Sequence, residues 1–318
     1  MKNIQREDIH IIGRYSNLTE KGIDKALKEN VYNDKEAWQK FFRLFFITLG
    51  IGFTVSGVIF FFAYNWADLH KFAKIGMVEG LIIATTILAL LPKININIRN
   101  IILTGAAALV GVLFAVYGQI YQTGANAYDF FLGWTIFVTL WVIVSNFAPL
   151  WLFYLVLINT TFILYVEQVA SDWSGTFVWT ALFIINTMVL VTAIILSKYK
   201  KIWTIPNWFL STVALACVSY ATIGIIDGIF SYESQVAFPL LILLTAIVFA
   251  TGIWHGLKMK SGFYLSVIAF SLIIIVSALF FKIDEEAMFL FASLFIVGSV
   301  TLTIIKLINL QKKWNNEK

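Results

Sequence analysis

The feature of this sequence that most restricts its fold is a series of long apolar runs. A helix of about 20 residues crosses the roughly 30 Å of hydrocarbon in a bilayer, and lipid tolerates only helices and closed barrels, because every backbone polar group must find a partner. Uninterrupted runs exclude the alternating strands of a barrel. We therefore predict an all-α polytopic transmembrane bundle of about 10 helices. The predicted spans lie near residues 41–64, 75–91, 100–118, 130–147, 149–166, 176–197, 208–229, 236–256, 262–281 and 287–308.

Composition agrees with a chain whose solvent is the lipid bilayer. Hydrophobic residues make up 60% of the chain and charged residues 13%, whereas about 25% of the residues in a soluble domain are charged. The net charge of +5 does not indicate nucleic acid as a partner, because the basic residues lie at the ends of apolar runs rather than along one soluble face. The partner that composition indicates is the bilayer itself.

The basic residues also predict the orientation of the chain. With the N-terminus inside the cell, 20 of the 23 Lys and Arg residues fall on the inner side and only Lys71, Lys74 and Lys282 fall outside, as the positive-inside rule requires. An even number of spans then places both termini in the cytoplasm, and we expect the bacterial inner membrane. The predicted parts are a cytoplasmic helical cap (1–40), the ten-helix transmembrane domain (41–308) and a cytoplasmic tail (309–318).

The predicted cap contains two helices. Ser16 or Thr19 can cap a short helix. This helix carries Ile23, Leu27 and Val31 on one stripe. Asp34 is the expected N-cap of a second helix, which continues without a breaker into the first span. The second helix of the cap and the first span are therefore expected to form one continuous rod.

The densest group of polar residues beside a span occupies positions 118–129, at the outer end of the third span. A helix that continued through this segment would place Gln119, Gln122, Asn126 and Asp129 on the face of a stripe of small residues, which lets another helix approach closely. Gly124 is an alternative end for the helix, and non-helical backbone at that depth requires protein or a watery cavity around it. Both geometries predict that these polar groups face the interior of the bundle. The small residues of the stripe are Ala107, Gly111, Ala115 and Gly118.

Two interpretations of this segment stay open. In the first, the amides form hydrogen bonds between helices and shape a tight outer turn, at about 1 kcal/mol each. In the second, a polar pocket open to the outer face binds a small polar or cationic solute. The residues of that predicted ligand-binding site are Gln119, Tyr121, Gln122, Asn126, Tyr128 and Asp129, together with Glu79 in the second span.

The octapeptide Gly118-Gln-Ile-Tyr-Gln-Thr-Gly-Ala125 also carries a resemblance to a known family. Together with Asn65-Trp66 before the second span and with Trp151 and Asn159 in the fifth, it is similar to the bacterial predicted-membrane-protein family called domain of unknown function 2157. The resemblance covers roughly residues 15–165. It implies a multi-pass membrane protein, and it supplies no activity, cofactor or catalytic residue.

Glu79 is the acidic residue placed within a predicted span. An ionised carboxylate in hydrocarbon costs at least about 2.5 kcal/mol, so such residues usually face a cavity or a partner. About one turn from the outer end of the second span, Glu79 can instead be solvated at the interface or paired with Lys74. A proton or cation site is the competing interpretation. Asp227, near the outer end of the seventh span, carries the same two interpretations.

No motif in the sequence predicts an enzyme or a cofactor. His10, His70 and His255 are far apart in the sequence, and Cys217 is a single cysteine in an apolar run, so we expect no metal site and no disulfide. Phosphate-binding loops and nucleophile elbows are absent from the sequence. We expect a non-enzymatic role in transport or sensing of a small polar or cationic solute. The alternative is a structural or assembly partner of another membrane protein, or a homo-oligomer.

Overall fold

The computed structural model describes most of the chain as helices in two compact units. The first unit comprises Met1–Ile120 and the second Tyr121–Lys318. Val31, Asp34, Asn65, Trp66 and Gln122, which the sequence analysis singled out, lie outside the described residues. The described residues are 9, 12–13, 15–16, 19–30, 35–64, 67, 69–121, 124, 126–198, 205–231, 236–283 and 286–316.

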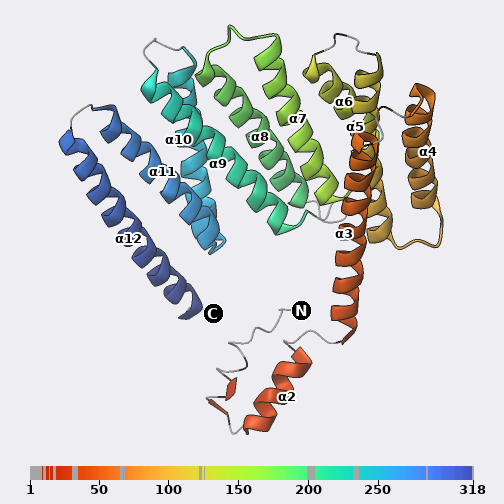
Figure 1. The fold of residues 1–318 in the computed structure, drawn as a ribbon. Helices are drawn as coiled ribbons and strands as arrows, with labels where there is room; N and C mark the ends of the chain where they lie inside the picture. Colours follow the sequence, from red (N-terminus) through yellow and green to blue (C-terminus); the bar gives the residue numbers. More distant parts are fainter. Residues whose placement is uncertain are drawn as a thin grey trace. The chain divides into compact units, whose positions relative to one another are not determined.

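Helices make up both units, and the described residues contain no strand (Figure 1). Ten helices in the described part of the chain are long and apolar enough to cross a membrane. The all-α, ten-helix class predicted from the apolar runs is therefore confirmed. The helices are α2 (Glu20–Asn30), α3 (Lys35–Tyr64), α4 (Lys71–Leu90), α5 (Ile96–Tyr121), α6 (Ala127–Ser145), α7 (Ala148–Gln168), α8 (Gly175–Lys198), α9 (Asn207–Phe230), α10 (Ala237–Lys258), α11 (Gly262–Lys282) and α12 (Glu286–Asn316).

Helix α3 is a single rod of 30 residues from Lys35 to Tyr64, about 45 Å long at 1.5 Å per residue. The prediction that one helix of the cap continues into the first span is confirmed. Helix α4 begins at Lys71, and His70 Nδ1 just before it accepts a hydrogen bond from the Phe72 N–H at 3.4 Å. His70 is thus a helix cap.

The core of the first unit lies where α3, α4 and α5 meet. Its buried side chains are Phe62, Val78, Leu109, Val112 and Val116. The approach of α3 to α5 depends on a glycine, because a Cβ at position 105 would lie 2.5 Å from Ile51 Cγ2.

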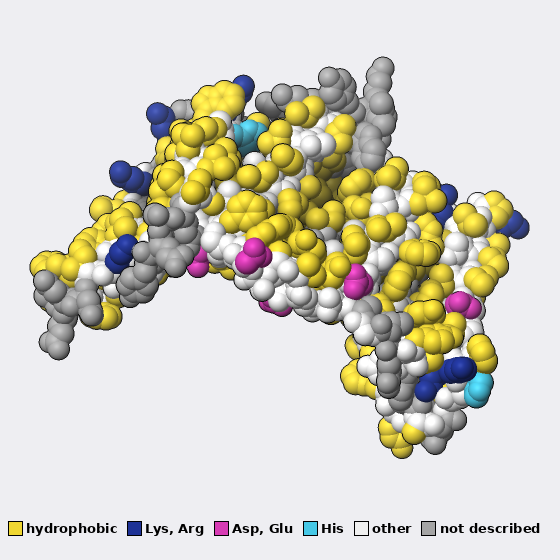
Figure 2. All heavy atoms as spheres, turned by 90° about the horizontal axis from the view of Figure 1, so that it is seen from above, with side chains coloured by type: hydrophobic (Ala, Val, Ile, Leu, Met, Phe, Trp, Pro, Cys, Tyr) yellow, Lys and Arg dark blue, Asp and Glu magenta, His cyan; other side chains and the backbone are white. Residues whose placement is uncertain are grey.

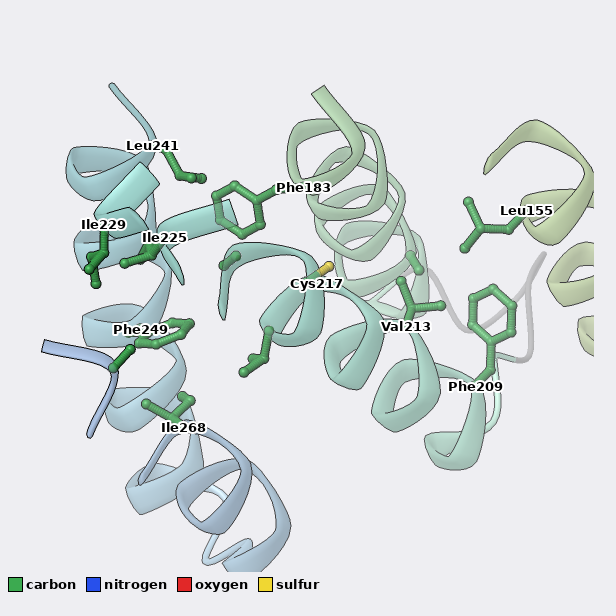
Figure 3. Packing of buried hydrophobic residues seen from close by; sticks show 14 residues of the cluster. Leu155, Phe183, Phe209, Val213, Cys217, Ile225, Ile229, Leu241, Phe249 and Ile268 are labelled. Atoms are coloured by element: carbon green, nitrogen blue, oxygen red, sulfur yellow. The ribbon is translucent and has the colours of Figure 1, made fainter. Parts of the chain in front are cut away.

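Helix α9 is the centre of the second unit. Val213, Cys217 and Ala221 recur every four residues along it and are buried against neighbouring helices. Figure 3 shows this cluster, to which α8, α10 and α11 also contribute side chains. Gly224 permits close packing here, since a Cβ at that position would lie 2.7 Å from the Trp179 side chain.

Helices α6 and α7 form a tight antiparallel hairpin. Two residues separate them, and the first, Asn146, adopts a left-handed conformation with φ 46°. Side chains tie the pair together along its length: Thr135 and Thr161 share a hydrogen bond of 3.2 Å, and Thr139 and Tyr154 share one of 2.8 Å. Inter-helix hydrogen bonds of this kind stabilise helix pairs in lipid.

Candidate functional site

The polar segment after α5 separates two helices. Helix α5 ends at Tyr121, Gly124 has a φ of +65°, and α6 begins at Ala127. A positive φ favours glycine because it has no Cβ to clash with the backbone. The prediction that one helix continues through Asn126 and Asp129 is therefore wrong, and the alternative in which the helix breaks near Gly124 is right.

Asp129 has a local structural role at the start of α6. Its Oδ2 accepts a hydrogen bond from the Asn126 N–H at 3.0 Å, and its own N–H donates to the Asn126 carbonyl oxygen at 3.1 Å. This is the carboxylate half of a capping box. The negative charge also lies at the positive end of the helix dipole, where it is favourable.

Tyr128 ties the same turn to the end of α7. Its backbone N–H donates to Gln168 Oε1 at 3.0 Å, and its ring meets the Tyr165 ring edge to face with the centroids 5.4 Å apart. These contacts close the open end of the α6–α7 hairpin, since they join the first turn of one helix to the last turn of the other.

The remaining described residues of the predicted pocket are open to their surroundings. The side chains of Gln119, Tyr121 and Asn126 are exposed, while those of Tyr128 and Asp129 are half-buried. Gln119 belongs to the first unit and the other four to the second. Gln119 lies near the end of α5 and Asn126 is the N-cap of α6, and the expectation that both amides face the bundle interior stays a prediction.

Glu79 lies deeper along its helix than the predicted span boundary implied. Helix α4 begins at Lys71, so Glu79 is about 12 Å along the axis from the start of the helix. Its side chain is exposed, and it forms no ion pair with any described residue. Lys74, by contrast, is buried at 7% exposure. The predicted pairing of Glu79 with Lys74 is not formed.

Asp227 joins the end of α9 to the start of α8. Its Oδ2 accepts a hydrogen bond from Thr176 Oγ1 at 2.9 Å, and Thr176 is fully buried. A Cβ at position 175 would lie 2.8 Å from the same carboxylate oxygen, so the glycine that begins α8 makes room for Asp227. These contacts favour a structural role for Asp227.

A buried pair of amides joins α7 and α8, and the sequence analysis named only one of its two residues. Asn159 Nδ2 donates to Asn186 Oδ1 at 3.2 Å, and Asn186 Nδ2 donates to Asn159 Oδ1 at 2.8 Å. Both side chains are buried. Asn159 entered the sequence analysis through the family resemblance, whereas Asn186 was missed. A lone Asn in an apolar run is a signal that could have found it, because such residues bond across helices in lipid.

A recess lined by glycines lies between α3 and α4 of the first unit and was also missed. Its volume is about 560 Å³, and its walls include Thr54 and Gly57 on α3 with Gly76, Met77 and Gly80 on α4. A Cβ added at any of the three glycines would meet no atom within 4 Å. The spacing Gly76-x-x-x-Gly80 in an apolar helix is a signal for helix association.

The fold and these contacts define a polytopic membrane protein whose helices are joined by buried polar pairs. Among the described residues, no three His, Cys, Asp or Glu side chains gather where they could hold a metal ion. Residues 18–151 match the model of the family described as Predicted membrane protein (DUF2157), so the resemblance found in the sequence is confirmed over this part of the chain. No curated protein and no solved structure matches the chain.

Proposed function

We propose that this protein is a non-enzymatic assembly partner in the bacterial inner membrane, with both termini in the cytoplasm. The observation that supports the proposal is the glycine-lined recess between α3 and α4. Its occupant is a transmembrane helix of another membrane protein.

The recess fits the physical requirements for helix association in lipid. In lipid the hydrophobic effect does not drive helices together, because lipid tails are as apolar as leucine. Helices there associate through close van der Waals packing instead. Gly76 and Gly80 are one turn apart on α4 and open to their surroundings. They let a partner backbone approach closely, while Met77 beside them can adapt its shape.

The test is to fill the recess and measure the partner. Gly80→Leu places a side chain in the recess, and Gly52→Leu is the matched control, since position 52 is also open on a span but does not line the recess. We expect the tagged wild-type protein to purify from gently solubilised membranes with a stoichiometric companion protein. The Gly80→Leu variant should purify with at least about tenfold less of that companion. Equal recovery with both variants would refute the proposal. A companion that is a second copy would indicate a homo-oligomer instead.

A second candidate function, transport or sensing of a small polar or cationic solute, is supported by the charge at one end of the second unit. Four carboxylates lie there, at the start of α6, the end of α7, the link between α7 and α8, and the end of α9, and Figure 2 looks down on this end. A surface of one sign raises the local concentration of oppositely charged solutes. These residues are Asp129, Glu167, Asp172 and Asp227.

The two candidates differ in what stabilises the protein. A solute-binding protein is stabilised by its ligand in proportion to the logarithm of ligand concentration. A panel of polyamines, amino acids and metal cations should raise the melting temperature in detergent, and Asp172→Asn, at an exposed position outside the helices, should weaken the effect. A flat response to the whole panel would refute the solute hypothesis and leave the assembly proposal untouched.

A further inference from the structure

A second cavity lies wholly within the second unit, among α8, α9, α10 and α11. Its volume is about 360 Å³, within the range of small-molecule sites. Cys217, Phe249 and Ile268 are among the buried residues of its wall, and Figure 3 labels all three in the core cluster. An engineered apolar cavity of about 150 Å³ holds one benzene molecule, so this one has room for about a dozen carbon atoms on the same scale.

The cavity reaches from the middle of the helices to one membrane boundary. Thr187 lies halfway along α8, whereas His255 is in the last turn of α10 and Phe263 is the second residue of α11. Its mouth opens sideways, because Val191 on α8 and Trp254 on α10 line it and are 48% and 62% exposed. A molecule in the bilayer can therefore enter without leaving the lipid.

The mouth of the cavity is basic. Lys258 Nζ lies 4.9 Å from the centroid of the Trp254 ring, and the His255 ring meets the Tyr264 ring with the centroids 5.5 Å apart. Lys260 follows in the short link to α11 and is exposed. No described carboxylate of the second unit lies at this end, since Asp129, Glu167, Asp172 and Asp227 are all at the opposite ends of their helices or in the links there.

We propose that this cavity is a binding site for an anionic phospholipid. One acyl chain lies along the apolar wall between α8 and α10, and the phosphate lies at the boundary near Lys258 and His255. A hydrocarbon chain matches the wall, because apolar side chains make up nearly all of it. A negative headgroup matches the rim, because basic residues beside a transmembrane pocket attract anionic lipids. Trp254 lies at the headgroup level, where amphipathic rings are favoured.

Thr187 makes the identity of the occupant testable. Its Oγ1 is buried, and the polar group beside it is the weakly hydrogen-bonding thiol of Cys217. A hydrocarbon chain forms no hydrogen bond with it, so Thr187→Val should bind phospholipid as well as the wild type does. A polar amphiphile that bonds to this hydroxyl would instead bind the variant more weakly.

The experiment measures lipid binding to the full chain purified in mild detergent. Native mass spectrometry counts bound lipid while phosphatidylglycerol is titrated, with phosphatidylcholine of the same acyl chains as the zwitterionic comparison. We expect phosphatidylglycerol to bind more tightly. Lys258→Gln should weaken it about fivefold, as loss of one cation near a membrane surface does, whereas Lys282→Gln, an exposed lysine at the other end of α11, should not.

A pair of tryptophan variants separates the cavity from ordinary contact with lipid. Val191→Trp blocks the mouth, and Val156→Trp is the matched control, because Val156 on α7 is 53% exposed and does not line the cavity. We expect the first to lose the tightly bound lipid and the second to keep it. The proposal would be overturned if the two tryptophan variants bound lipid equally, or if phosphatidylglycerol and phosphatidylcholine bound equally. Weaker phospholipid binding by Thr187→Val would also overturn it.

Discussion

The buried amide pair between α7 and α8 permits a quantitative prediction. Replacing Asn186 with leucine, which is similar in size, removes both hydrogen bonds to Asn159 and leaves that amide in an apolar interior. The double variant Asn159→Leu/Asn186→Leu removes both partners together. The two changes differ in one respect only: the single variant leaves an unpaired polar group and the double variant does not.

The structure sets the size of the expected effect. Two hydrogen bonds join the helices, and such bonds in lipid contribute on average about 0.6 kcal/mol each. An unsatisfied buried amide costs about 1–3 kcal/mol, and Asn159, the amide that Asn186→Leu leaves behind, is buried. We expect Asn186→Leu to lower the free energy of unfolding by about 1–3 kcal/mol. The double variant should fall within about 1 kcal/mol of the wild type, because replacing both partners with apolar groups is nearly neutral.

The assay is equilibrium unfolding in mixed micelles, followed by circular dichroism as the denaturing detergent increases. The coupling between the two positions should be at least about 1 kcal/mol, since residues in one hydrogen-bonded pair are not additive. Asn186→Leu combined with Thr139→Val is the control, because Thr139 bonds to Tyr154 in a separate pair, and these effects should add within about 0.5 kcal/mol. If the losses in free energy of unfolding caused by Asn159→Leu and Asn186→Leu also added in the double variant, the two amides would not stabilise the protein as a hydrogen-bonded pair.

Three further predictions concern topology, packing and charge. In a Cys217→Ser background, a cysteine at Asn126 should react with an impermeant thiol reagent from outside intact cells and one at Lys260 should not; the reverse pattern would invert the orientation. Gly224→Ala should lower the free energy of unfolding by about 1–3 kcal/mol, because side-chain atoms lie 2.7 and 2.8 Å from the new Cβ; unchanged thermal stability would contradict this packing. Glu79→Gln should raise thermal stability at neutral pH by removing a charge from lipid, and a loss of stability would instead indicate a bound cation or partner.

The helices could be predicted from the sequence because membrane spans are a local property of the chain. Apolar length alone located each membrane span, and the absence of a breaker after residue 34 indicated the rod of α3. Helix ends depend on capping, which is also local. Asn126 and Asp129 have capping-box spacing, and Gly124 is a helix breaker. Giving these local signals more weight than the small-residue stripe would have predicted the turn.

The site could not be predicted in the same way, because inter-helix contacts join residues that are far apart in the sequence. Asn186 is bonded to a residue 27 positions away and Asp227 to one 51 positions away. Which faces of two helices meet is decided by packing of the whole bundle, as at Gly224, rather than by either helix alone. The open recess beside Gly80 and the cavity beside Phe249 are likewise properties of several helices together.

The α6–α7 hairpin has a consequence for the order in which the protein is made. Its hydrogen bonds join residues only 15, 26 and 40 positions apart, and every one of them is available once the ribosome has passed Gln168. Short-range contacts form quickly because little loop entropy is lost. The hairpin can therefore enter the bilayer as a paired unit, with its threonine hydroxyls already satisfied, before α8 and α9 have been synthesised.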